Sequence, residues 1–332
     1  MEHQTSADKE IEASEPQVGR RGFLTAAGAL AAAAIGSTTV AGNAEAQTIN
    51  CASVSGSVAW KQPGNNHHML ELTKSGSASK GAVTIDYFGH CALKITSPAG
   101  LTMMFDPWRN EPSGAWGLWF PKEFPRTVVD ICLSTHTHFD HDAIDRVDAT
   151  SVLDRMIGGW SFADVKITAI PDKHATDAPG WYKWINAVKE FGQDPYPPNN
   201  PGHLDMVTFV VETGGMRILV WGDNRHNPSD EVWKQWGKID VLTLPVDGSQ
   251  HILSYEQGNA IVERLKPKIV IPTHYLAEGV SVTLSTLQSA DEWVQAQKNK
   301  RKLTSPKLVL DAGSISSMDR EFHYFGNNVD HG

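Results

Sequence analysis

Cysteine is scarce in this chain of 332 residues, which has only Cys51, Cys91 and Cys132. So small and odd a number gives no disulfide framework of the kind that holds small secreted domains together. Cys132 stands in an apolar run and is expected in the core. Cys51 follows Ile49 and Asn50 rather than the small residues expected before a lipid-modified cysteine. The fold must therefore be stabilised mainly by a hydrophobic core.

Basic residues are also in deficit, with 29 Lys and Arg against 38 Asp and Glu and a formal net charge of −9. No cluster of lysine or arginine stands out. Proteins that bind nucleic acid or anionic membrane surfaces use such clusters, so neither partner is expected. A small-molecule substrate, neutral or apolar, fits this charge balance better. The oligomeric state stays open, a homo-oligomer included.

A membrane-spanning segment is lacking near the N-terminus. The alanine-rich stretch 26–35 falls far short of the ~20 residues that span a bilayer, so stable membrane insertion is not expected. Arg20-Arg21 precedes this stretch, and Ala44-Glu45-Ala46 offers small residues for cleavage. This order predicts a twin-arginine signal peptide over residues 1–46 and export to the periplasm or the medium. The alternative is a solvated arginine pair beside a disordered tail.

Residues 47–80 are rich in serine, glycine and asparagine without an apolar period, which predicts an extended leader. The folded domain is expected over residues 81–327, beginning with three short β-prone runs joined in part by a turn at 97–100, an antiparallel start. The run 128–135 is more continuously apolar, typical of a buried strand that delivers functional residues at its end. The strand candidates are 83–88, 92–96, 101–105, 128–135, 165–170, 207–212, 217–221, 240–244 and 269–271.

Two helices follow from the same sequence patterns. Ser254 and Gln257 have capping-box spacing, and Lys266-Pro267 marks the end of a helix over 254–265. A second helix is expected from Thr286 to about Lys298. Strands followed by single helices predict two sheets with helices outside, an α/β fold of the four-layer αββα sandwich type.

Two aromatic stretches interrupt these elements, at 108–125 and 181–201. Long loops in compact domains usually act as lids or binding loops, although a role at a domain interface is the alternative. The chain has 11 tryptophans. They either line a pocket for an apolar or aromatic substrate or fill the core.

The strongest chemical signal is the alternation of imidazoles and carboxylates directly after run 128–135. His136, His138, Asp140 and His141 would project several ligands into one small volume. Capping or solvent exposure would explain a single aspartate here but not three histidines, since neutral imidazole is the commonest metal ligand. The donors are all nitrogen and oxygen, which suits one or two Zn²⁺ ions first, with Mn²⁺ or iron as alternatives.

His-x-His-x-Asp-His after an apolar strand resembles the signature of the metallo-β-lactamase superfamily. The resemblance continues in order from about Val83 to about Tyr275 and implies an αββα hydrolase domain. The matching segments look like the branch that contains ascorbate-phosphate lactonase and N-acylphosphatidylethanolamine phospholipase D. These segments are Phe88-Gly89-His90, Phe105-Asp106-Pro107-Trp108, Ile170-Pro171-Asp172-Lys173-His174, Trp221-Gly222-Asp223 and Pro272-Thr273-His274-Tyr275.

Carried over residue by residue, the resemblance implies two metals and a metal-bound hydroxide as nucleophile. Asp223 would bridge the metals, where antibiotic-hydrolysing members often carry a cysteine, so a penicillin-type substrate is disfavoured. Two cations ~3.5–4 Å apart lower the pKa of a shared water towards ~7. The implied ligands are His136, His138 and His174 for one metal, and Asp140, His141 and His274 for the other.

The remaining polar candidates are less constrained. The catalytic candidates are Asp140, His90 and His251: His90 is expected near the site, in contact with substrate or behind a ligand, and His251 ranks above His203 and His226 among the loop histidines. Asp106 is expected to orient a ligand histidine, as carboxylates behind metal ligands often do.

Three reactions suit such a centre: hydrolysis of a neutral ester, lactone or amide, hydrolytic dehalogenation of a chlorinated aromatic such as chlorothalonil, and phosphodiester cleavage. A phosphate ester would need a cationic clamp, for which Arg109, Arg217 and Arg225 are the candidates and Arg225 the best placed. The aromatic loops favour the first two reactions. A metal-binding envelope protein without turnover is a further alternative, because likeness of fold does not choose a substrate.

Overall fold

The computed structural model describes residues 60–61, 69–70, 80–114, 116–175, 205–282 and 287–332. The expected signal peptide, most of the leader, loop 181–201 and His203 lie outside this part of the chain. Two short strands of the leader, β1 (Trp60–Lys61) and β2 (Met69–Leu70), pair antiparallel. Among the described residues, none of the helices is long and apolar enough to cross a membrane.

The first sheet has six strands in the order β15-β3-β4-β5-β6-β7. The predicted antiparallel start is present: β3, β4 and β5 pair antiparallel, and the Gly100 amide donates to the Ser97 carbonyl at 2.9 Å in the turn. β6 pairs parallel with both β5 and β7. The strands are β3 (Val83–Tyr87), β4 (Leu93–Thr96), β5 (Thr102–Phe105), β6 (Thr127–Ser134), β7 (Val147–Asp154) and β15 (Lys307–Leu310).

The second sheet has eight strands in the order β14-β16-β13-β12-β11-β10-β9-β8. β8, β9, β10 and β11 pair antiparallel in succession, whereas β11, β12, β13 and β16 run parallel. Of the parallel strands, β12 and β13 are mostly apolar and buried throughout, as expected for strands covered on both faces. The strands are β8 (Gly158–Phe162), β9 (Val165–Asp172), β10 (Met206–Thr213), β11 (Met216–Val220), β12 (Val241–Pro245), β13 (Ile269–Thr273), β14 (Lys300–Lys302) and β16 (Glu321–Tyr324).

The helix predicted over 254–265 is confirmed as α4 (Tyr255–Leu265), with Ser254 and Gln257 forming the capping box. The second prediction was too long, because α5 covers only Asp291–Ala296. The Gln288 carbonyl accepts a hydrogen bond from the Leu276 amide at 3.1 Å instead of starting a helix. The other helical segments are η1 (Ile144–Arg146), α3 (Asp230–Trp236) and α6 (Ala312–Ile315).

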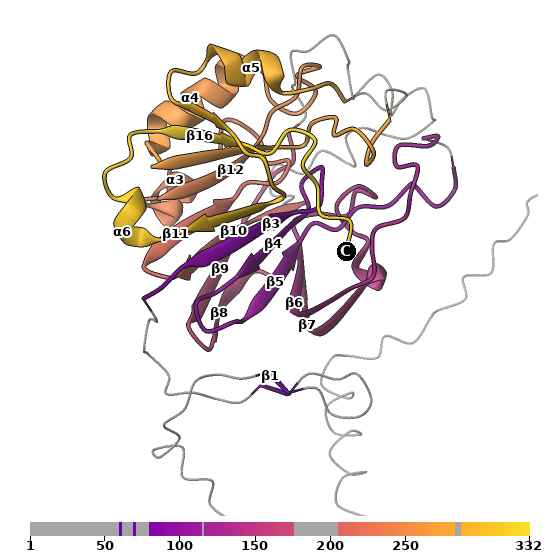
Figure 1. Ribbon diagram of the computed structural model, residues 1–332, viewed down its shortest axis with the longest axis horizontal. Helices are drawn as coiled ribbons and strands as arrows, with labels where there is room; N and C mark the ends of the chain where they lie inside the picture. The colour runs from indigo at the N-terminus through magenta and orange to yellow at the C-terminus, as the bar shows by residue number, and fades with distance from the viewer. Residues whose placement is uncertain (1–59, 62–68, 71–79, 115, 176–204, 283–286) are drawn as a thin grey trace, which may run out of the picture. The chain divides into compact units, whose positions relative to one another are not determined.

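The two sheets face each other, and α3, α4 and α5 lie on the outer side of the eight-stranded sheet (Figure 1). Phe105 of β5 meets Phe209 of β10 between the sheets, with ring centroids 5.8 Å apart. Gly258 of α4 lies close to Leu244 of β12, where an added Cβ would be 3.7 Å from the leucine. The α/β class and the two-sheet architecture expected from the sequence are confirmed, with the described helical layer on one side.

The tryptophans that the structure describes serve mainly as core. Trp221, Trp233 and Trp236 pack together between β11 and α3, with ring centroids 4.8–5.9 Å apart. The Trp236 indole also donates to the Thr208 hydroxyl at 2.8 Å. Trp293 of α5 packs on Phe322 of β16. The core interpretation therefore holds for these four side chains.

The aromatic stretch 108–125 contains no helix or strand among its described residues, as predicted. Its side chains nevertheless turn inward: Trp108 stacks on Phe120 at 4.4 Å and meets Phe124 edge-on at 5.2 Å, and all three are buried. Among the described residues of this stretch, only Leu118 is an exposed large apolar side chain. These aromatic side chains of the loop are therefore packed into the fold and do not form an exposed surface for substrate.

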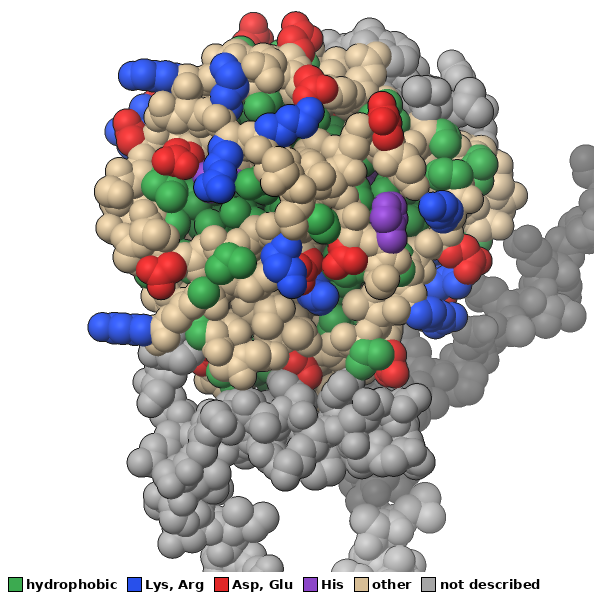
Figure 2. Space-filling view, viewed as in Figure 1, with side chains coloured by type: hydrophobic (Ala, Val, Ile, Leu, Met, Phe, Trp, Pro, Cys, Tyr) green, Lys and Arg blue, Asp and Glu red, His purple; other side chains and the backbone are tan. Residues whose placement is uncertain are grey.

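The surface agrees with the composition. On the face shown in Figure 2, lysine and arginine side chains are interspersed with aspartate and glutamate, and neither sign gathers into one patch.

Candidate metal centre

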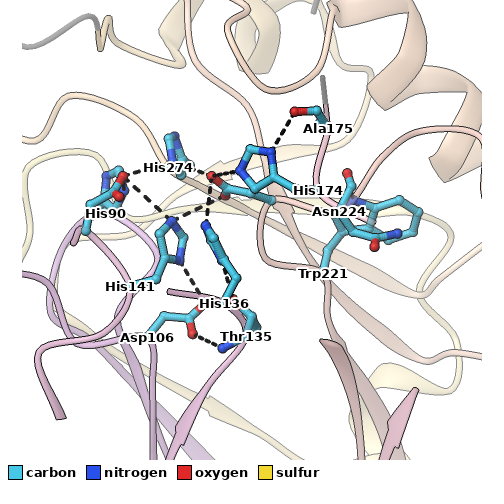
Figure 3. A network of polar contacts seen from close by, with 12 residues as sticks. His90, Asp106, Thr135, His136, His141, His174, Ala175, Trp221, Asn224 and His274 are labelled. Carbon is cyan, nitrogen blue, oxygen red and sulfur yellow. Dashed lines mark hydrogen bonds and ion pairs between the residues drawn. The ribbon is translucent and has the colours of Figure 1, made fainter. Parts of the chain in front are cut away.

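The polar residues of the signature segments lie where four strands end. β6 is followed by the segment from Thr135 to His141, and β9 by His174. β11 is followed by Asp223, and β13 by His274. Figure 3 shows the imidazoles of His136, His141, His174 and His274 directed toward one another. Both sheets therefore contribute to a single site.

The structure brings the seven predicted ligands together in two groups of donor atoms that lie within 4.8 Å of one another. His136, His138, His174 and Asp223 form the first group. Asp140, His141 and His274 form the second, and His90 joins them. This division matches the one implied by the family resemblance.

Asp223 faces both groups. Its Oδ2 lies 3.5 Å from His174 Nε2 and 3.8 Å from His136 Nε2. The same carboxylate lies 3.4 Å from His141 Nε2 through Oδ1 and 3.2 Å from His274 Nε2 through Oδ2. No other carboxylate of the described residues belongs to the first group. Asp223 therefore has the position of a bridge.

The donor atoms suit metal ions. Among the described residues, His136 Nε2, His141 Nε2, His274 Nε2 and Asp223 Oδ1 are buried and accept or donate no hydrogen bond. Buried polar atoms without a partner are costly, so their convergence on one small volume calls for a ligand. Imidazole nitrogens and carboxylate oxygens are the usual donors to Zn²⁺, Mn²⁺ and iron, and the site fits two such cations.

The protonation states fall into two classes. Burial lowers the pKa of His136 well below its usual value and that of His138 and His90 to about 3, which keeps these imidazoles neutral. Burial also opposes charge on His274, but Asp223 and Asp140 outweigh it and raise its pKa to about 9. The pKa of His141 is raised well above its usual value by the same two carboxylates against burial. Without metal, protons therefore take the place of cations beside Asp140 and Asp223.

Residues 84–274 match the family described as "Beta-lactamase superfamily domain". The chain belongs to the metallo-β-lactamase superfamily. It is 42% identical over 256 residues to a UPF0173 metal-dependent hydrolase of Thermodesulfovibrio yellowstonii, covering 70% of this chain and 92% of that protein. A UPF0173 metal-dependent hydrolase of Myxococcus xanthus is 25% identical over 254 residues, covering 73% of this chain and 86% of the relative.

A solved structure of a metallo-β-lactamase superfamily protein from Thermotoga maritima has the same fold, with a TM-score of 0.50 and 18% identity over 73% of this chain and 98% of that one. The protein is accordingly a metal-dependent hydrolase of this superfamily. These likenesses do not single out the lactonase, phospholipase or dehalogenase branch.

Asp106 orients the ligand histidine His141 through its Nδ1 atom, as expected from the sequence. Its Oδ2 lies 3.0 Å from His141 Nδ1 and accepts from the Thr135 hydroxyl at 2.9 Å, while Oδ1 accepts from the Thr135 amide at 2.8 Å. The Thr135 hydroxyl also lies 3.0 Å from His136 Nδ1. One buried carboxylate thus fixes ring orientation for a ligand in each group.

Replacing Asp106 with asparagine should weaken metal binding by ~10–100-fold, the usual cost of losing a carboxylate behind a metal-ligating histidine. Equilibrium competition against a chromophoric chelator measures the effect. Asp86→Asn is the matched control, because Asp86 is a buried carboxylate of the same sheet that pairs with Lys94 at 3.3 Å. Equal affinity in Asp106→Asn and Asp86→Asn would contradict the orienting role.

The arginines considered as phosphate clamps are all engaged in ion pairs. Arg225 pairs with Asp172 at 2.6 Å, and Asp172 is itself buried. Arg109 pairs with Asp142 at 2.9 Å and Arg217 with Glu212 at 2.9 Å. These guanidinium groups therefore brace the scaffold in the structure.

His251, ranked first among the loop histidines from the sequence, lies beside the second group. Its Nδ1 lies 2.9 Å from Asp247 Oδ2, and its ring centroid is 4.8 Å from that of His274. His226 is half-buried and belongs to neither metal group. Sequence reasoning missed Asp247, although it follows β12 just as the metal ligands follow their strands. It also missed Cys91, whose sulfur lies within 4.8 Å of donor atoms of His141 and Asp223.

Proposed function

We propose that this hydrolase acts on a small neutral, apolar or aromatic substrate, by hydrolysis of an ester, lactone or amide or by hydrolytic dehalogenation of a chlorinated aromatic such as chlorothalonil. The observation that carries the proposal is the pair of ligand groups that share Asp223. The ion-paired arginines support a neutral substrate, since an anionic one would gain from a free cation.

Each residue has a definable task in such a reaction. Two cations bound in the ligand groups would lower the pKa of a shared water towards ~7 and polarise the bond that is attacked. Asp223 would hold both cations, because it is the carboxylate that both groups contact. Asp106 keeps the His141 ring in place. Asp247 holds the His251 imidazole through Nδ1 at 2.9 Å and so orients it beside His274.

Two other functions have less support. A phosphodiesterase of the phospholipase D type would need a basic clamp, and the three candidate arginines are already paired. A metal-binding envelope protein without turnover would not need a bridging aspartate together with a complete set of histidines.

A parallel assay of the metal-replete protein on chlorothalonil, a set of lactones and bis-p-nitrophenyl phosphate tests the proposal. We expect turnover of chlorothalonil or a lactone, and loss of that turnover in His138→Ala, which removes a ligand of the first group. His226→Ala is the matched control, because it removes a half-buried histidine outside both groups. Turnover of the phosphodiester alone would favour the phospholipase-like alternative, and no turnover of any substrate would refute the proposal.

A further inference from the structure

His90 is in direct contact with residues of the second ligand group. Its side chain is fully buried, and its Nε2 lies 2.9 Å from Asp140 Oδ2. Its ring centroid lies 4.0 Å from that of His274 and 5.3 Å from that of His141. A ring nitrogen of His90 is within 4.8 Å of the donor atoms of all three residues. Figure 3 shows His90 and His274 side by side at the edge of the centre.

The turn between β3 and β4 is shaped to deliver this imidazole. Gly89 has a φ of 88°, and a Cβ on it would lie 2.7 Å from Val280 Cγ1, so the backbone can approach only as glycine. The His90 carbonyl accepts from the His274 amide at 2.9 Å. This bond ties the backbone of the turn directly to the ligand His274. The Phe120 and His90 rings pack nearly perpendicular to each other, with ring centroids 5.7 Å apart.

We propose that His90 is a fourth side-chain ligand of the metal held by Asp140, His141 and His274, an inference that rests on the metal centre of the proposed function. With Asp223 as bridge, the second position then has five protein donors, His90, Asp140, His141, His274 and Asp223, whereas the first has four, His136, His138, His174 and Asp223.

The two positions would then differ in role. Protein-bound zinc uses four ligands and expands to five at catalytic sites, so a second cation with five protein donors and a share of the water would be saturated. The first position, with one protein donor fewer, would have the more open coordination sphere. Substrate would therefore bind at the cation of His136, His138 and His174, while the second cation would act as a fixed charge.

The alternative is that His90 only donates a hydrogen bond to Asp140 and touches no metal. A distance of 2.9 Å fits both arrangements, because two ligands of one cation also lie about 3 Å apart when their bonds of ~2.1 Å meet at a right angle. Two substitutions separate them. His90→Gln keeps an N–H donor without the imidazole, and His90→Ala removes both.

Stepwise titration of the metal-free proteins with Co²⁺ and with Zn²⁺, against a competing chelator, tests the proposal. We expect the second equivalent to bind more than ~100-fold more weakly in both variants, beyond the ~10–100-fold typical of a group that only supports a ligand. The visible absorption of Co²⁺ at the second position should strengthen as its coordination number falls. X-ray absorption should count one imidazole fewer per protein in both variants. Parental affinity and spectrum in His90→Gln would overturn the proposal.

His323→Gln is the matched control, because His323 is a buried histidine of β16 outside both ligand groups. It should titrate as the parent does. Thermal melting of the metal-free variants reports any loss of fold independently of metal. Since the readout is metal binding, a protein that shows the His90 effect but turns over none of the assayed substrates would refute the proposed function and leave this inference standing.

Discussion

Replacing Asp223 with alanine should lower hydrolysis by more than ~100-fold, above the usual cost of losing a group that only supports a ligand. Asp223 contacts histidines of both groups at 3.2–3.8 Å, so its loss removes the bridge and leaves two separate sets of imidazoles. Steady-state kinetics on whichever assayed substrate the parent turns over measures the effect. Metal analysis of the same preparation should show that at least one equivalent has been lost.

Asp223→Asn provides the matched comparison, because it keeps the size of the side chain and one carbonyl oxygen. We expect its activity to fall between those of the parent and the alanine variant. If Asp223→Ala keeps both metals and at least a tenth of the parental rate, the bridging role is wrong.

Metal affinity should rise by about tenfold or more per pH unit between about pH 7 and pH 9, where the affinity of the second position is governed by His274. Asp223 and Asp140 raise the pKa of His274 to about 9 despite its burial, so a cation must displace this proton. The pKa of His141 is raised as well, which adds to the slope. Chelator competition across this range, with proton release followed in weak buffer, measures the coupling. A flat affinity profile would contradict it.

The stability of the metal-free protein should also depend on pH through these histidines. His274 and His138 should act in opposite directions, because the pKa of the first is raised and that of the second is lowered. The raised pKa of His274 gives stability that is complete below 6.5 and is lost as pH rises through about 9. The lowered pKa of His138 gives stability that is present above 6.5 and is lost as pH falls towards about 3. The free energy of unfolding without metal should therefore be highest near pH 6.5, while bound metal should protect the alkaline side.

The cluster from His136 to His141 could be predicted as a metal site from a local pattern, alternating imidazoles and carboxylates directly after an apolar strand, whereas His174, Asp223 and His274 were implied as ligands by the family resemblance. His136, His174, Asp223 and His274 follow β6, β9, β11 and β13, and the periodicity of those strands is local information. The capping box of α4 is likewise formed by residues close together in the sequence, Ser254 and Gln257. These features need no knowledge of distant contacts.

The features that escaped prediction depend on tertiary contacts. The residues just before α5 contact a distant segment, since the Gln288 carbonyl accepts a hydrogen bond from the Leu276 amide. Arg225 forms an ion pair with Asp172, which is 53 residues earlier in the chain, and so is not a free cation at the site. The sequence placed His90 near the site but could not show its contact with Asp140, which forms only when the β3–β4 turn meets the segment after β6.

Because the ligands come from both sheets, the metals would act as a cross-link between the two halves of the sandwich. His136, His138, Asp140 and His141 follow β6 of one sheet, whereas His174, Asp223 and His274 follow strands of the other. The first set is made before the second during synthesis, so a complete centre cannot exist until β13 has been added and both sheets have docked. Completion of the metal centre would therefore be a late event in folding, and the free energy of metal binding would stabilise the finished pair of sheets rather than either one alone.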